Sequence, residues 1–184
     1  MDAFEHIASR YFEAQGYWTR VGVKIALTKE EKRDLGNPSM PRPEVDIIGF
    51  KPHLNELLII ECKSYLDSDG VRIENFDGTD SLHKERFKMF NRDSLRKLVT
   101  AKLIEQLRQE GLLLAGDPKV NYGVVAGNIK AGHESKLIAK FQEMGWLLVT
   151  PSALASGLRK FASRGYENDI VTMVIKILER NVGQ

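Results

Sequence analysis

The chain is almost free of cysteine: Cys62 is the only one among 184 residues. No disulfide can therefore form within it, which excludes a small disulfide-stapled scaffold and suits a reducing cytosol. No apolar run is long enough to cross a bilayer. The N-terminus also lacks the basic stretch followed by an apolar segment that marks a secretory signal. We therefore expect a cytoplasmic protein with no membrane partner.

The chain also has little net charge, because 27 Lys and Arg residues face 25 Asp and Glu residues. A net charge of +2 neither requires nor excludes a polyanionic partner. The hydrophobic fraction of 42% is typical of a globular protein. The length fits one domain over residues 1–184, without a repeat or a clear linker.

Hydrophobic periodicity predicts an α/β protein with a mixed central sheet flanked by helices. The polar stretch 28–43 is expected to be an exposed loop because it is rich in glycine and proline. The segment 64–91 is hard to assign. The expected order is α-β-β-β-α-β-α-β-α-α: a helix over 2–15, strands over 17–27, 44–50 and 57–63, a helix over 93–110, a strand over 120–126, a helix over 134–144, a strand over 146–150, and helices over 152–162 and 168–180.

The second and third predicted strands bring charged residues to one end of the sheet. The link 51–56 is short, which favours an antiparallel hairpin. Side chains alternate along a strand, so Glu61 and Lys63 share a face with Ile59. On the second strand the same rule groups Val45 with Ile47 and places Asp46 on the other face. In such a hairpin Asp46 comes close to Glu61.

Two carboxylates and an amine at the end of a buried sheet are costly unless their charges are compensated. A divalent cation compensates two carboxylates, and Mg²⁺ commonly takes one or two of them. A bound metal can activate water and stabilise the leaving oxygen of a phosphodiester. A neighbouring lysine can orient the water or stabilise the phosphate charge. The alternative is a ladder of surface ion pairs at a strand end.

The two strands resemble the PD-(D/E)XK nuclease superfamily, and look nearest to Mrr-type endonucleases and archaeal Holliday-junction resolvases. The residues that carry the resemblance are Pro43-Glu44-Val45-Asp46-Ile47-Ile48 and Leu57-Leu58-Ile59-Ile60-Glu61-Cys62-Lys63. Val45 stands where the family usually has its proline, which is often missing in active members.

The resemblance implies a restriction-endonuclease-like fold and a DNA endonuclease that uses Mg²⁺ or Mn²⁺. By it, Asp46 and Glu61 bind the metal, the backbone carbonyl of Cys62 completes the metal shell, and Lys63 assists the attack by water. The family often adds a glutamate from the first helix. At about 100° per residue Glu5 falls on the edge of the core-facing stripe, whereas Glu13 falls nearly opposite its centre. We therefore expect Glu5 to support the metal.

Further residues are candidates around this site. Four basic residues are expected to track a phosphate backbone, although they could equally form a solvated helix face. These are Lys88, Arg92, Arg96 and Lys97. Three more are possible supporting residues: Glu44, Lys102 and Gln106. Alternatively, Lys102 extends its charge to solvent and Gln106 bonds to backbone.

Two other functions stay open. The chain could be a catalytically silent nuclease-fold protein that binds DNA or a protein partner. A nucleotide-binding module around Gly123, Gly127 and Gly132 is more distant, because the spacings of the known phosphate-binding loops are absent. No separate target-recognition domain is evident. The protein therefore reads DNA shape, forms a homodimer, or relies on a partner subunit for target choice.

Overall fold

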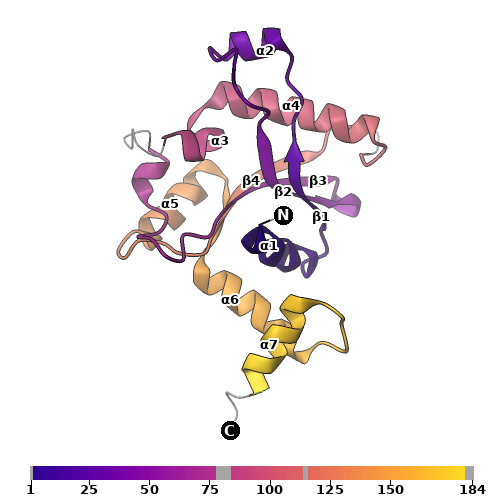
Figure 1. Cartoon of the computed structure of the whole chain (residues 1–184), viewed down its shortest axis with the longest axis vertical. Coiled ribbons are helices and arrows are strands. Elements are labelled where there is room, and N and C mark those ends of the chain that lie inside the picture. Colours follow the sequence, from indigo (N-terminus) through magenta and orange to yellow (C-terminus); the bar gives the residue numbers. More distant parts are fainter. Residues whose placement is uncertain (1, 78–83, 114–115, 181–184) are drawn as a thin grey trace.

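The computed structural model describes residues 2–77, 84–113 and 116–180, and shows a five-stranded mixed sheet flanked by helices (Figure 1). The strands are β1 (Trp18–Lys24), β2 (Glu44–Lys51), β3 (Glu56–Lys63), β4 (Lys119–Ala126) and β5 (Leu147–Val149). The helices are α1 (Ala3–Glu13), α2 (Lys29–Asp34), α3 (Lys88–Asn91), α4 (Asp93–Gln109), α5 (Glu134–Met144), α6 (Pro151–Arg159) and α7 (Ile170–Arg180). The predicted α/β class is confirmed.

The strands lie in the order β1-β2-β3-β4-β5, so neighbours in sequence are neighbours in the sheet. β2 pairs antiparallel with β1 and with β3, which confirms the predicted hairpin. β3 and β4 run parallel, as do β4 and β5. Parallel neighbours need a crossover, and α4 and α5 lie in these two connections. β3 is therefore the central strand, bonded on both sides.

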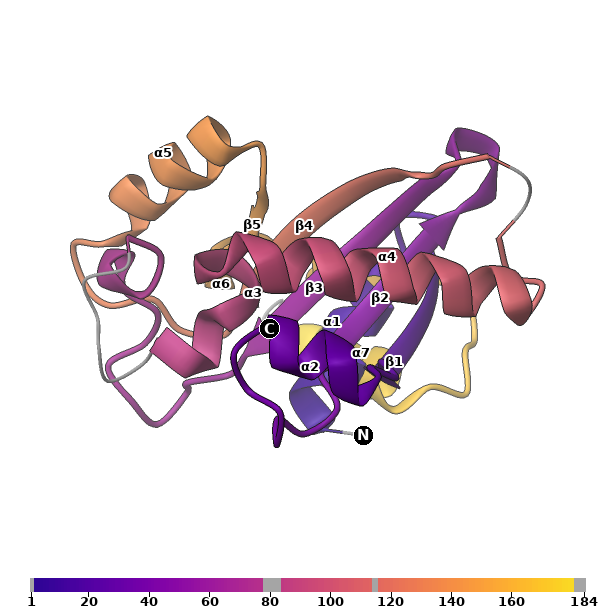
Figure 2. The ribbon, with the colours of Figure 1, turned by 90° about the horizontal axis from the view of Figure 1, so that it is seen from above.

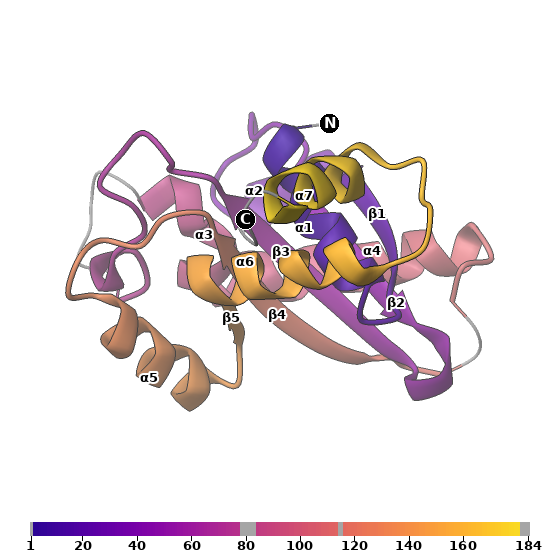
Figure 3. The ribbon, with the colours of Figure 1, turned by 90° about the horizontal axis from the view of Figure 1, so that it is seen from below.

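Two apolar layers sandwich the sheet, and β3 contributes to both. Leu57 and Ile59 pack in one cluster with residues of α4, which lies across the face seen in Figure 2. Leu58 and Ile60 pack in the other cluster with residues of α1. Figure 3 shows α1, α6 and α7 on this second face. Because both faces are covered, β3 is apolar and buried from Leu57 to Ile60, and charged residues resume at Glu61.

The expectation of a loop over residues 28–43 is wrong in part, because α2 lies inside it. Thr28 and Glu31 form a capping box: the Glu31 N–H donates to Thr28 Oγ1 at 3.2 Å, and the Thr28 N–H donates to Glu31 Oε2 at 2.8 Å. The sequence pattern of Thr followed three residues later by Glu is the known signal for such a start. Local capping therefore makes a helix here although α2 buries no residue.

The C-terminal helix α7 is tied to α1 by charged side chains. Arg10 of α1 lies 3.1 Å from Glu167 and 3.3 Å from Asp169, which precedes α7. Asp169 also accepts a hydrogen bond from the Thr172 N–H at 2.8 Å, so it caps the start of the helix. Among the described residues, no helix is both long and apolar enough to span a membrane.

Candidate active site

The candidate site lies where β2 and β3 separate. Their register ends at the pair Ile47–Ile60, so Asp46 stands opposite Glu61, one residue further along. On the other side of β2 the regular pairing skips Gly22, which has a φ of +65°. The alternation of β2 is interrupted at this point. Val45 packs in the cluster of α4 rather than with Ile47, which corrects the predicted grouping of these two residues.

Asp46 is held by the backbone of β3. The Cys62 N–H donates to Asp46 Oδ2 at 2.7 Å. The carboxylate thus bonds to β3 beyond the last strand pair, and this bond fixes its position. Burial raises the pKa of Asp46, and the Cys62 N–H and the Lys63 ammonium oppose that rise only in part.

Glu61 and Lys63 project from the same face of β3 and contact each other as an ion pair, as the alternation predicts. Each side chain is 17% exposed. Burial raises the pKa of Glu61, and the nearby Asp46 carboxylate adds to the rise. Burial disfavours the Lys63 ammonium, but the Glu61 carboxylate outweighs burial and raises the pKa of Lys63. Lys63 therefore keeps its charge, and its Nζ lies 5.6 Å from the centre of the Phe87 ring.

Glu5 approaches Asp46 from α1, which covers the opposite face of the sheet from Glu61. Burial and then the Asp46 carboxylate raise the pKa of Glu5. Glu5 also caps its own helix, because the Asp2 N–H donates to Glu5 Oε2 at 3.4 Å. Glu13 instead accepts a hydrogen bond from Thr19 Oγ1 at 2.6 Å. The structure thus separates the two glutamates as helical geometry predicts, with Glu5 beside Asp46.

The donor set around Asp46 fits a divalent cation held by two protein carboxylates. Asp46 and Glu61 are largely buried acids with raised pKa values, so added positive charge would stabilise both. Mg²⁺ often binds in this way and leaves its other positions to water and phosphate. Over residues 2–77, 84–113 and 116–180, no three His, Cys, Asp or Glu side chains gather closely enough to hold a metal. Among these described residues Glu5 therefore does not join Asp46 and Glu61 in a three-acid ligand set. Burial raises the pKa of the Cys62 thiol, so the thiol stays protonated, and the ligand role of the Cys62 backbone carbonyl stays a prediction.

The four predicted DNA-binding residues lie in different environments. Arg96 is only 14% exposed, donates to Met89 O at 3.1 Å and stacks on Trp146 at 5.4 Å, so it is a structural residue rather than a surface phosphate contact. Arg92 donates to Leu35 O at 2.9 Å and joins α4 to the end of α2. Lys97 is 76% exposed and pairs with Asp93. Lys88 lies close enough to the site for its charge to act against the rise in the pKa of Glu61.

The three supporting residues also differ. Glu44 is exposed, and its charge helps to raise the pKa of Asp46. Lys102 lies 2.8 Å from Glu31 of α2 and therefore connects α2 to α4. Gln106 donates to Glu110 Oε1 at 3.2 Å. Glu44 is thus close enough for its charge to act on Asp46, and its supporting role stays a prediction, whereas Lys102 and Gln106 bind acids outside the site.

Close packing accounts for two of the glycines that suggested a nucleotide-binding turn. The Gly127 N–H donates to Lys63 O at 2.8 Å, and a Cβ on Gly127 would lie 2.3 Å from Ser64 O. A Cβ on Gly123 would lie 2.8 Å from Leu147 O. Gly123 lets β4 pass close to the backbone of Leu147, and Gly127, directly after β4, lets the chain pass close to the backbone of Ser64.

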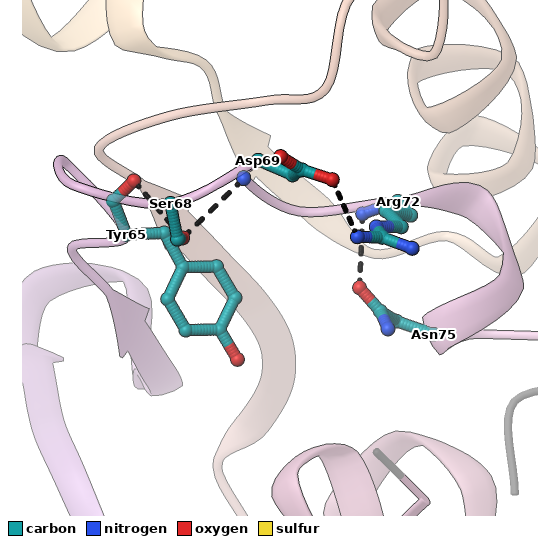
Figure 4. Close-up of a pocket in the computed structure, with 6 residues that line it drawn as sticks. Tyr65, Ser68, Asp69, Arg72 and Asn75 are labelled. Atoms are coloured by element: carbon teal, nitrogen blue, oxygen red, sulfur yellow. Dashed lines mark hydrogen bonds and ion pairs between the residues drawn. The ribbon is translucent and has the colours of Figure 1, made fainter. Parts of the chain in front are cut away.

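Sequence reasoning missed one feature, a polar cavity formed by the loop after β3. Tyr65, Ser68, Asp69, Gly70, Arg72 and Asn75 line it (Figure 4). The turn-rich composition of the unassigned segment 64–91 signalled a loop but not its shape. Lys63 ends β3 and Tyr65 follows two residues later, so the cavity adjoins the candidate site.

Comparisons with protein-family models, with curated proteins and with solved structures each found no match to this chain.

Proposed function

We propose that this protein is a metal-dependent endonuclease that hydrolyses DNA phosphodiester bonds on a restriction-endonuclease-like fold. The observation that carries the proposal is the convergence of Asp46, Glu61 and Lys63 where β2 and β3 separate. Three charged groups at the end of a buried strand are costly unless other charges compensate them. Such clusters are therefore typical of functional sites.

Asp46 and Glu61 are the residues that would hold Mg²⁺ or Mn²⁺. When bound, such an ion supplies Lewis-acid activation of water and stabilises the leaving oxygen. The Cys62 N–H holds the Asp46 carboxylate in place, so this ligand is positioned before substrate arrives. Glu5, with its own raised pKa, adds negative charge beside Asp46.

Lys63 is the group that would act on the phosphate. It is cationic because Glu61 raises its pKa. A fixed ammonium can donate a hydrogen bond to the attacking water and stabilise the charge that grows on the phosphate oxygens. Its aromatic neighbour Phe87 and its ion-pair partner both limit where the ammonium can lie.

An endonuclease must also bind the DNA backbone and select a target. Lys88 and Lys97 are the members of the predicted basic set that remain available for phosphate contacts, given the structural bonds of Arg92 and Arg96. Phosphate contacts position a protein on DNA without reading its sequence. Target choice therefore rests on DNA shape, on a homodimer, or on a partner subunit.

The test is a cleavage assay on plasmid, linear and branched DNA in Mg²⁺, Mn²⁺ or EDTA. Wild type should nick or cut in either metal and be silent in EDTA, and Asp46→Ala should be inactive. Lys119→Ala is the matched control, because it removes an exposed lysine of β4 that lies beside Glu56, at the other end of β3 from Lys63, and should cut normally. Cutting that survives EDTA or Asp46→Ala would contradict the mechanism. DNA binding without any cutting would support the catalytically silent alternative.

A further inference from the structure

The loop after β3 lines an open cavity of about 300 Å³, at the lower end of the volumes found for small-molecule sites. The loop is pinned to the segment after β4: the Val71 N–H donates to Asn128 O at 3.0 Å, and the Lys130 N–H donates to Val71 O at 3.0 Å. Gly70 has a φ of +90°, and a Cβ there would lie 2.8 Å from the backbone of Ile129. The cavity wall at Gly70 and Val71 is therefore fixed by backbone contacts with the segment after β4.

The cavity adjoins the proposed reaction centre. Tyr65 lines it and follows Lys63 by two residues, which span at most about 7 Å of chain. Tyr65 is one of two non-glycine residues with positive φ in the described part of the chain, at 43°. Its Oη is buried and has no hydrogen-bond partner among the described residues. A strained backbone and an unsatisfied hydroxyl both carry a cost, and such costs concentrate at functional sites.

Arg72 supplies the positive charge of the cavity. Its guanidinium pairs with Asp69 at 2.8 Å, and its backbone N–H donates to Asn75 Oδ1 at 2.9 Å (Figure 4). The two paired side chains are 36% and 65% exposed. Exposed ion pairs of this kind contribute little, whereas a guanidinium binds phosphate through two parallel hydrogen bonds. Arg72 can therefore exchange Asp69 for a phosphate at low cost.

We infer that this cavity binds a backbone phosphate of the nucleic-acid strand, next to the phosphodiester that is cut, with Arg72 as its ligand. The inference rests on the proposed function for the identity of that strand. A contact here would fix the strand relative to Lys63. Asp69 would compete with the phosphate for the same guanidinium.

The test measures binding of a labelled oligonucleotide in EDTA, where no cutting is expected. Arg72→Gln should weaken binding about tenfold at low salt and reduce the salt slope by about 1. Asp69→Asn should tighten binding, since it frees Arg72. The matched controls come from a second exposed pair, Arg108 and Asp117, which lie 2.6 Å apart in another part of the structure. Arg108→Gln and Asp117→Asn should each leave binding unchanged.

A further variant and a further ligand test the same phosphate site. Arg72→Lys should bind with intermediate affinity, because it keeps the charge but loses the paired hydrogen bonds. If Arg72→Gln binds like Arg108→Gln, the inference is overturned. If inorganic phosphate stabilises wild type but not Arg72→Gln against heat, while the oligonucleotide binds both equally, the cavity takes a free anion and the strand assignment is overturned.

The two proposals fail separately. Wild type that binds through Arg72 but never cuts overturns the nuclease and leaves the phosphate site standing. If cutting is lost in Asp46→Ala but unchanged in Arg72→Gln, the phosphate site is overturned and the nuclease stands.

Discussion

In the proposed reaction, Lys63 is the residue that acts directly on the water and the phosphate. Replacing it by Met keeps the apolar stem over Phe87 and removes the charge. We expect Lys63→Met to slow cleavage about 100-fold to 1,000-fold, the range found when one stabilising donor is lost. Single-turnover cleavage under saturating protein measures this directly.

Lys119→Met is the control for Lys63→Met, since Lys119 is 72% exposed and lies beside Glu56, at the other end of β3 from Lys63. Circular dichroism should show that both variants fold. A cleavage rate of Lys63→Met equal to that of Lys119→Met would show that the ammonium plays no part in the reaction.

Gly127 gives a second test at the scale of single residues. A Cβ there would press on Ser64 O, which belongs to backbone and has little room to move. We therefore expect Gly127→Ala to lower the free energy of unfolding by about 1–3 kcal/mol. Urea denaturation provides the measurement. Gly165→Ala is the control, because the space around Gly165 is open, and equal stability of the two variants would refute the packing argument.

The sequence predicts the position of a side chain well when that position depends only on neighbouring residues of the same strand or helix. The shared face of Glu61 and Lys63 follows from strand alternation, and the choice of Glu5 over Glu13 follows from helical rotation. The roles of Arg96 and Lys102 could not be predicted, because their partners Trp146 and Glu31 are far away in the sequence.

At the scale of elements, α7 depends on the residue that precedes it. Asp169 accepts bonds from the Thr172 N–H and from Thr172 Oγ1, each at 2.8 Å, and pairs with Arg10. Asp169→Ala should therefore destabilise the protein by about 1–2 kcal/mol, the usual cost of losing an N-cap. Thermal or urea unfolding at neutral pH measures this, with Asp117→Ala as the control at a 91% exposed aspartate.

The same residue predicts a pH dependence. Burial works to raise the pKa of Asp169, but the Thr172 bonds and the Arg10 charge prevail and lower it. A group whose pKa is lowered on folding stabilises the protein above its ordinary pKa and loses that effect as the pH falls through the folded value. The stability gap between wild type and Asp169→Ala should therefore shrink below about pH 4. A gap that stays constant down to full acid unfolding would contradict this reading.

Element boundaries were predictable where the signals are strong. The predicted helix over 134–144 matches α5 at both ends, and Gly145 at φ +66° ends it as a left-handed cap. α2 was missed because proline and glycine further along the segment outweighed its capping box. The interruption of β2 at Asp46 could not be predicted, since it arises opposite Gly22 on another strand.

At the scale of the whole molecule, the sheet explains why the charges gather where they do. β3 is covered on both faces and bonded on both sides, so its interior is closed to charge. Charged side chains can be placed only where the pairing of β2 with β3 ends, and Asp46, Glu61 and Lys63 all lie at that point. Hydrophobic patterning predicted the layers and the hairpin. It could not predict the cavity around Arg72, whose walls come from backbone pairing between the loop after β3 and the segment after β4.

The central claim is that Asp46 and Glu61 together bind one divalent cation. Calorimetric titration with Mn²⁺ tests it most directly, using Asp46→Asn and Glu61→Gln, which keep side-chain size, and Glu105→Gln as an exposed control on α4. We predict one site in wild type and in Glu105→Gln, weakened at least about tenfold in each of the other two variants. Wild type that binds no Mn²⁺, or binding that is unchanged in both Asp46→Asn and Glu61→Gln, would contradict the account.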